Sequence, residues 1–146
     1  MTTIILRHRR ENLKKCSLRG LENHPDLKFY TYPTDILPNY SGLLLLKVGA
    51  PPLTLEDRER DLLLIDGTWR LAQTIEAQLP WPIETRSLPG SYKTAYPRKQ
   101  TACSHPESGL SSVEALYLAH RFLGRSTEKF LDQYYWRESF LRCNAL

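Results

Sequence analysis

The sequence predicts an α/β fold, with a mostly parallel sheet flanked by helices. The first observation is that residues 43–48 and 62–65 are almost wholly aliphatic. Strands of a parallel sheet are covered on both faces, so they are apolar along their whole length. The second observation is that residues 62–65 run into a polar turn and then into the helix-forming stretch 70–77. Strand, turn and helix in this order are typical of a parallel sheet.

The other elements follow along the chain from composition and turn signals. Residues 7–20 indicate a basic loop, or such a loop with one short helix. Ser111 followed by Glu114 fits a capping box, Gly124 ends that helix, and Ser126 is expected to cap the last one. Further strands are expected at 2–6, 28–32 and 85–88, helices at 54–61, 69–79, 111–124 and 126–141, and a long loop at 89–109.

Length and apolar content are those of one compact unit. The chain has 146 residues, of which 41% are hydrophobic, and this is enough for a core. No apolar run approaches the ~20 residues that a membrane helix needs. The apolar start is too short for a signal peptide. We therefore expect a cytoplasmic protein that does not enter a membrane.

The three cysteines, at positions 16, 103 and 143, are widely spaced and include no CxxC pair. This spacing favours free thiols over a disulfide framework or a zinc site. The four histidines form no cluster either. We therefore expect no bound metal and no thiol nucleophile.

The basic residues behind the net charge of +4 are concentrated in two segments, and the second places its cations beside Tyr92 and Tyr96. Cations hold phosphates while nearby rings stack on unpaired bases, so the pattern favours RNA over a merely solvated basic face. The cations expected to contact RNA are Arg9, Arg10, Lys14, Lys15 and Arg19 in the first segment, and Lys93, Arg98 and Lys99 in the second.

Asp66 and Trp69 follow directly on the apolar run 62–65. In open α/β sheets, ligands bind at the carboxyl ends of the strands, so a cofactor would lie at this turn. The plain alternative is that Asp66 caps the following helix and Trp69 fills the core. The rest of the chain favours the functional interpretation.

Asp66-Gly67-Thr68-Trp69 resembles the motif of the DTW-domain proteins, which modify uridine in tRNA. The flanking segments resemble more closely the small-subunit rRNA aminocarboxypropyltransferases of archaea and eukaryotes, a group in the same superfamily. The segment 11–21 is similar to that family's D-P-K-K-C-[ST]-G-x-K-L. Six segments match its motifs in the right order, at residues 11–21, 43–57, 66–69, 86–89, 110–115 and 135–144.

The resemblance implies a SPOUT-like fold with a C-terminal trefoil knot, and S-adenosylmethionine as the cofactor. It implies transfer of the 3-amino-3-carboxypropyl group to N3 of a uridine or pseudouridine in RNA, which releases methylthioadenosine. Small-subunit rRNA, modified during ribosome biogenesis, is the favoured substrate, and tRNA is the alternative. Residues 1–60 would then carry an RNA-facing loop, and residues 61–146 the cofactor-binding part.

The motifs also imply roles for single residues. Trp69 would pack against the methionine part of the cofactor, and Ser17 would bind its polar end. Asp66 would either hold the amino group of the cofactor or take the N3 proton of the base, and the sequence leaves this open. The cofactor-binding set is Ser17, Leu46, Asp66, Thr68, Trp69, Leu88, Leu110, Ser111 and Ser112, and the catalytic pair is Asp66 and Trp69.

Two departures from the family keep other functions open. Gly67-Thr68 stands where the rRNA family has Cys-Ser, and Tyr96 stands where it has Asn. One alternative is an RNA methyltransferase of the SPOUT class, in which the cofactor would present another carbon. The other is a non-catalytic RNA-binding factor in ribosome assembly. The alternative for Leu46 and Leu88 is that they are plain core residues, and the alternative for Glu114 is that it only caps its helix. We favour a monomer.

Overall fold

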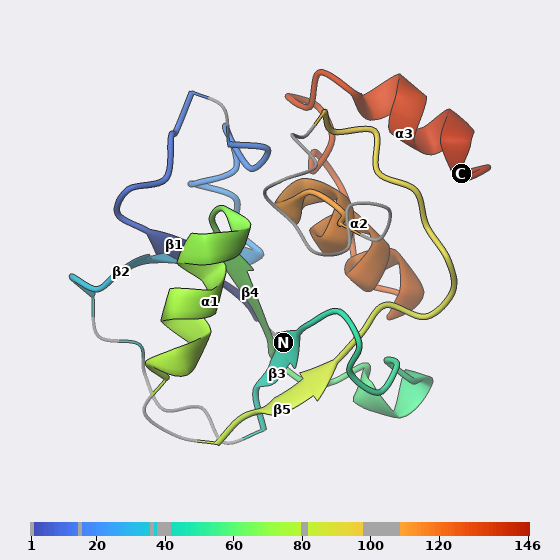
Figure 1. The fold of residues 1–146 in the computed structure, drawn as a ribbon. Coiled ribbons are helices and arrows are strands. Elements are labelled where there is room, and N and C mark those ends of the chain that lie inside the picture. The colour runs from blue at the N-terminus through green and yellow to red at the C-terminus, as the bar shows by residue number, and fades with distance from the viewer. Residues whose placement is uncertain (1, 15, 36, 38–41, 80–81, 98–108) are drawn as a thin grey trace.

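The aliphatic runs form the centre of a parallel sheet, as expected. The computed structural model describes residues 2–14, 16–35, 37, 42–79, 82–97 and 109–146. Within these residues, five strands pair in the order β2-β1-β4-β3-β5, and each neighbouring pair is parallel (Figure 1). The strands are β1 (Thr3–His8), β2 (Leu27–Tyr32), β3 (Leu44–Leu46), β4 (Leu62–Asp66) and β5 (Glu84–Arg86).

The register of β1 and β4 places two opposite charges at one edge of the sheet. All six residues of β1 are buried, and Arg7 pairs directly across from Asp66. Both residues lie at the carboxyl ends of their strands, which meet at the same edge of a parallel sheet. This is the edge at which the sequence predicts ligand binding.

Helices cover both faces of the sheet (Figure 1). Helix α1 (Trp69–Ala77) contributes Ile75 to the core cluster that contains Ile4. Helix α2 (Ser112–Phe122) contributes to the cluster that contains Ile5. Because successive residues of a strand point to opposite faces, the two helices lie on opposite sides of β1. Among the described residues, no helix is both long and apolar enough to cross a membrane.

Three expected elements are shorter or shifted. The run 43–48 forms only β3, because the chain turns at Gly49, where φ is +84°. The strand expected at 85–88 is β5, which starts one residue earlier in register with β3. The helix expected at 54–61 is a single 3-10 turn, η1 (Leu55–Asp57), because this charged segment has no apolar face to bury.

The prediction of one last helix over 126–141 is wrong. The chain makes turns over 128–133, and helix α3 spans Arg137–Cys143. Lys129 has a φ of +67°, which an α-helix does not accommodate. Phe130 and its apolar neighbours anchor these turns in the core instead of forming a helical stripe, and Phe130 is 1% exposed.

His120 is a buried link between α2 and β1. Its Nε2 lies 2.7 Å from Thr3 Oγ1, and its Nδ1 lies 3.1 Å from the backbone oxygen of Ser126. A neutral ring satisfies both contacts when Nδ1 donates to Ser126 and Nε2 accepts from Thr3. Burial lowers the pKa of His120 from 6.5 to about 4, and the bond to Ser126 opposes this only in part.

We expect acid to destabilise the fold through His120. The unfolded imidazole takes up a proton near pH 6.5, whereas the folded one stays neutral down to about pH 4. Protons therefore favour the unfolded chain, and about 3 kcal/mol of stability is lost between pH 7 and pH 4. Urea unfolding at both pH values measures this loss. The His120→Gln variant should lose less, and an equal loss in both proteins would assign the acid sensitivity to other groups.

Candidate functional site

Asp66 is a buried carboxylate that joins three segments of the chain at the end of β4. Its Oδ2 accepts from Arg7 Nε at 2.9 Å and from the Cys16 thiol at 3.1 Å. Its Oδ1 accepts from the Ser112 hydroxyl at 2.8 Å. Each oxygen of a carboxylate accepts about two hydrogen bonds. Among the described residues Oδ2 has two donors and Oδ1 has one, so Oδ1 can accept one more.

The interpretation of 7–20 as a basic loop is wrong for its first two residues. Arg7 and His8 belong to β1 and are buried. Arg7 forms an ion pair with Asp66, and its guanidinium carbon lies 4.8 Å from the centroid of the Phe29 ring. Arg7 is therefore a residue of the site that sequence reasoning missed. The sequence did contain a signal for this ion pair: a cation lies near the end of one apolar strand, and an acid lies at the end of another.

Cys16 is a buried, protonated thiol. Burial, and then the negative charge of Asp66, raise its pKa to about 12. The thiol donates to Asp66 and accepts from Arg7 Nη2 at 3.5 Å. It is not a nucleophile at neutral pH, because the thiolate is the reactive form. Cys16 and Cys143 are free thiols, as expected, and Cys103 lies outside the described residues.

Glu11 supplies a second carboxylate at this edge. Burial, and then the charge of Asp66, raise its pKa. Its Oε2 is buried and has no hydrogen-bond partner among the residues that the structure describes. The same atom would lie 3.6 Å from a Cβ added to Gly67, so Glu11 closes over the glycine of the 66–69 motif. A buried acceptor without a donor is rare, which makes Glu11 a candidate for ligand contact.

The N-terminus of α2 faces the same cluster. The expected capping box between Ser111 and Glu114 is confirmed. The Ser17 hydroxyl accepts from the backbone N–H of Val113 at 3.1 Å, so the N-terminal segment is tied to the first turn of the helix. Helix N-termini carry a partial positive charge and favour anions.

Glu114 does more than cap α2. It is fully buried, and its Oε1 accepts from Ser111 N at 2.8 Å and from Thr94 Oγ1 at 2.6 Å. Its Oε2 accepts from Ala95 N at 2.8 Å and from the Tyr134 hydroxyl at 3.0 Å. Burial raises the pKa of Tyr134 above its usual range, so its hydroxyl stays protonated. One carboxylate thus fixes two distant segments against the start of α2.

The structure brings part of the expected cofactor set together. Ser17 and Asp66 meet Ser111 and Ser112 at the start of α2. Thr68 caps α1, since its hydroxyl accepts from Leu71 N at 3.4 Å. Trp69 begins α1, and its side chain lies outside the described part of the chain. The three expected leucines are half-buried against the core cluster that includes Ile5 and Val113: Leu46, Leu88 and Leu110.

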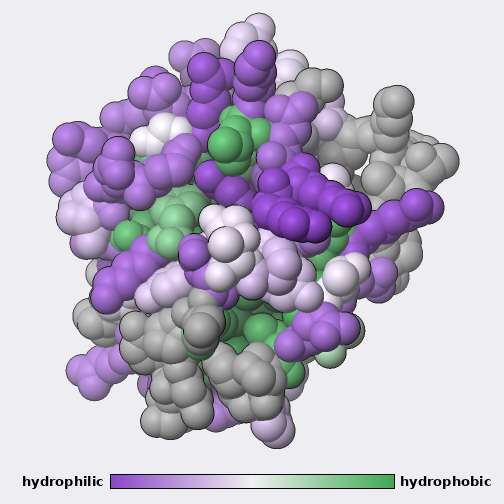
Figure 2. Space-filling model, turned by 90° about the vertical axis from the view of Figure 1, so that its left-hand side faces the viewer, coloured by the Kyte–Doolittle hydropathy of each residue, from purple (hydrophilic) through white to green (hydrophobic). Residues whose placement is uncertain are grey.

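The cations expected to contact RNA lie on the surface where the structure describes them. The exposed ones are Arg9, Arg10, Lys14, Arg19 and Lys93. Lys15, Arg98 and Lys99 lie outside the described residues. Figure 2 shows the face on the side of β2 and the N-terminal segment, where hydrophilic side chains surround smaller apolar patches.

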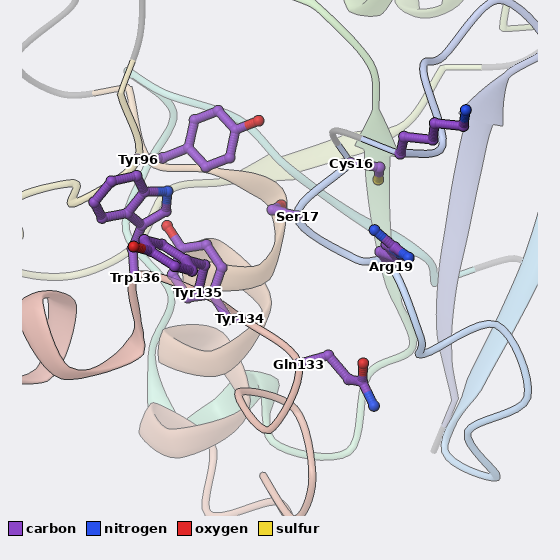
Figure 3. Close-up of a pocket in the computed structure, with 9 residues that line it drawn as sticks. Cys16, Ser17, Arg19, Tyr96, Gln133, Tyr134, Tyr135 and Trp136 are labelled. Atoms are coloured by element: carbon purple, nitrogen blue, oxygen red, sulfur yellow. The ribbon is translucent and has the colours of Figure 1, made fainter.

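A pocket of about 230 Å³ lies beside the Asp66 cluster (Figure 3). Cys16 and Ser17 belong to one of its walls, and the aromatic residues of the other wall come from the loop before α2 and the chain entering α3. The remaining lining residues are Lys14, Arg19, Tyr96, Gln133, Tyr134, Tyr135 and Trp136. The sequence analysis places Tyr96 beside basic residues, but it does not predict the rest of this wall, because it expects residues 134–136 to lie within one helix over 126–141.

No protein-family model matches the chain, and no curated protein matches it. A solved structure does match: that of the SAM-dependent rRNA:acp-transferase Tsr3 from Vulcanisaeta distributa. The chain has the fold of Tsr3. The two structures align with a TM-score of 0.71 and 23% sequence identity, over 97% of this chain and 77% of the Tsr3 chain.

The Tsr3 match confirms the α/β fold class that the sequence predicts. The structural neighbour is an rRNA aminocarboxypropyltransferase, the class of protein whose motifs the six segments resemble. Tsr3 is described as dependent on S-adenosylmethionine. Within the described part of this chain, no group of three or more His, Cys, Asp or Glu side chains is placed to hold a metal ion.

Proposed function

We propose that the chain transfers the 3-amino-3-carboxypropyl group of S-adenosylmethionine to N3 of a uridine or pseudouridine in RNA, with small-subunit rRNA as the substrate. The observation that carries this proposal is the fold shared with Tsr3 over 97% of the chain. The ordered motifs support it. The proposal includes a SPOUT-like topology with a trefoil knot in the C-terminal part, action as a monomer, and no metal requirement.

The polar groups at the strand ends suit the amino-acid end of this cofactor. The Ser17 hydroxyl and the N-terminus of α2 would receive its carboxylate. The open position on Asp66 Oδ1 and the Oε2 of Glu11 would receive its ammonium. Among the described residues Glu11 Oε2 has no donor, and a buried polar group without a partner costs about 1–3 kcal/mol, so an ammonium there would remove this cost.

When bound, the cofactor supplies an electrophilic carbon on a sulfonium, and methylthioadenosine is its leaving group. The residues of the chain would decide which carbon is exposed, because the RNA nucleophile must align with that carbon and the sulfur. Trp69 would pack beside the sulfonium. Leu46 and Leu88 would line the adenine slot, and the backbone of residues 110–112 would hold the adenine edge and the ribose.

The contacts of Asp66 support an anchoring role over that of a proton acceptor. A general base must reach the proton that it removes. Asp66 is 3% exposed and is held by three donors from three segments. We propose that it fixes the ends of β1 and β4 and the start of α2, that its Oδ1 holds the ammonium, and that the N3 proton of the base therefore passes to water.

Mass spectrometry of the small-molecule products tests the proposal. The purified protein is incubated with S-adenosylmethionine and total RNA from cells that lack the gene. We expect methylthioadenosine that forms only when RNA is present. Trp69→Ala should abolish this product, whereas Leu55→Ala, at an exposed position on η1, should not.

The other products decide between the alternatives. S-adenosylhomocysteine would make the protein a methyltransferase and would overturn the proposed orientation of the cofactor. RNA binding without any cofactor product, and without calorimetric binding of S-adenosylmethionine, would favour a non-catalytic ribosome-assembly factor.

A further inference from the structure

The pocket beside the Asp66 cluster has a wall of aromatic rings. The rings of Tyr96 and Tyr134 are nearly parallel, with an interplanar angle of 6° and centroids 6.5 Å apart. Tyr135 meets Trp136 edge to face, with centroids 4.7 Å apart. Figure 3 shows these four side chains gathered on one side, with Ser17 and Arg19 across from them. Flat apolar rings of this kind favour a flat ligand.

Two observations indicate that this wall is built for contact with a ligand. Tyr135 is 85% exposed, although its ring packs against Trp136. Glu114 fixes the parallel pair at two points, because its Oε2 accepts from the Tyr134 hydroxyl and from the backbone N–H of Ala95, next to Tyr96. A surface of preset rings loses little conformational entropy when a ligand binds.

The remaining lining residues indicate the charge of the ligand. Lys14 and Arg19 are both exposed at this pocket, and its described lining contains no carboxylate. Gln133 adds an amide that both donates and accepts, and it packs closely over Gly20, where an added Cβ would lie 2.9 Å from its Cγ. A nucleotide fits this lining, because it joins a flat base with polar edges to an anionic phosphate.

We propose that this pocket binds one unpaired nucleotide of the RNA substrate, with its base against the aromatic rings and its phosphate at Lys14 and Arg19. This rests on the proposed function. Ser17 and Cys16 line the pocket and also bond the start of α2 and Asp66, so the nucleotide lies next to the proposed cofactor site. The pocket thus presents an unstacked base close to the point of transfer.

Fluorescence anisotropy with a labelled nine-nucleotide oligouridylate tests the pocket in the 146-residue chain. Stacking on one aromatic side chain changes affinity by about ten- to a hundredfold. We expect Tyr135→Ala to weaken binding by this factor without changing its salt dependence, and Tyr135→Phe to retain binding. Lys14→Ala should reduce the slope of log affinity against log salt by about 0.7. Leu55→Ala is the matched control, because Leu55 is an exposed apolar residue away from the pocket.

A second measurement locates the base directly. An oligouridylate with one 4-thiouridine should crosslink, on irradiation, to Tyr135, Trp136 or Tyr96. Unchanged RNA affinity in Tyr135→Ala, or crosslinks confined to other surfaces, would overturn the proposal that this pocket binds a nucleotide. Weaker calorimetric binding of S-adenosylmethionine in Tyr135→Ala, with RNA affinity unchanged, would also overturn it and would assign the pocket to the cofactor.

The product assay separates this inference from the proposed function. Methylthioadenosine formed without crosslinks in the pocket would overturn the nucleotide pocket and leave the transfer reaction standing. Crosslinks in the pocket without methylthioadenosine would overturn the proposed transfer reaction, but they would still support nucleotide binding in the pocket.

Discussion

Replacement of Glu114 by alanine is expected to lower the free energy of unfolding by about 3–5 kcal/mol. The side chain is fully buried, and its two oxygens accept from four donors. Removing the carboxylate leaves these donors without partners in the core, and each buried donor without an acceptor is penalised. The change should also loosen residues 94–96, and with them the Tyr96 side of the pocket.

Urea unfolding of the variants measures this loss and separates its causes. Ser111→Ala removes the cap hydroxyl but leaves Glu114 in place, so it should cost about 1 kcal/mol, as a lost N-cap does. Glu114→Gln keeps the shape of the side chain but turns one oxygen into a donor that faces other donors. Its loss should lie between those of the other two variants. If Glu114→Ala cost no more than Ser111→Ala, the carboxylate would be only a helix cap.

The contacts of Ser111 and Glu114 show which interactions can be predicted from neighbouring residues in the sequence and which cannot. The capping box was predictable because both partners lie within one helical turn, where spacing fixes geometry. The contacts of Glu114 with Thr94 and Tyr134 were not, because they join segments about 20 residues away on either side. Nothing in the spacing of these residues indicates which distant donors a buried carboxylate will meet.

The order of the strands in the sheet is likewise not predictable from local sequence. Apolar runs predict β1 and β4, because strands covered on both faces must be apolar. They do not predict that β1 and β4 are neighbours, since strand order depends on how the chain crosses over the sheet. The sequence therefore predicts Arg7 in a basic loop, whereas the pairing of the two strands places it against Asp66.

The chain between α2 and α3 was mispredicted for a different reason. Apolar residues at 130, 131 and 134 have the spacing of a helical stripe, but here each anchors a tight turn in the core. Periodicity does not distinguish these cases when the segment is short. The sequence therefore predicts the exposed Tyr135 as a helix residue, and it does not predict the aromatic wall that Tyr135 forms with Trp136.

Breaking the Arg7–Asp66 ion pair from one side is expected to destabilise the protein strongly. Both side chains are nearly buried, with 10% and 4% of their surface exposed. Asp66→Leu alone should cost about 3–5 kcal/mol, because it leaves the guanidinium of Arg7 buried without a counter-charge. The double variant Arg7→Met with Asp66→Leu removes both charges, so it should recover most of this stability, and urea unfolding compares the two.

The double variant also separates the structural role of Asp66 from its role in the site. It keeps an apolar contact with Phe29 but has no oxygen for an ammonium. We expect it to be folded and yet to form no methylthioadenosine and to bind S-adenosylmethionine at least tenfold more weakly. Restored transfer in the double variant would show that Asp66 only balances the charge of Arg7. A double variant as unstable as Asp66→Leu would show instead that Cys16 and Ser112, the other donors to Asp66, account for its contribution to stability.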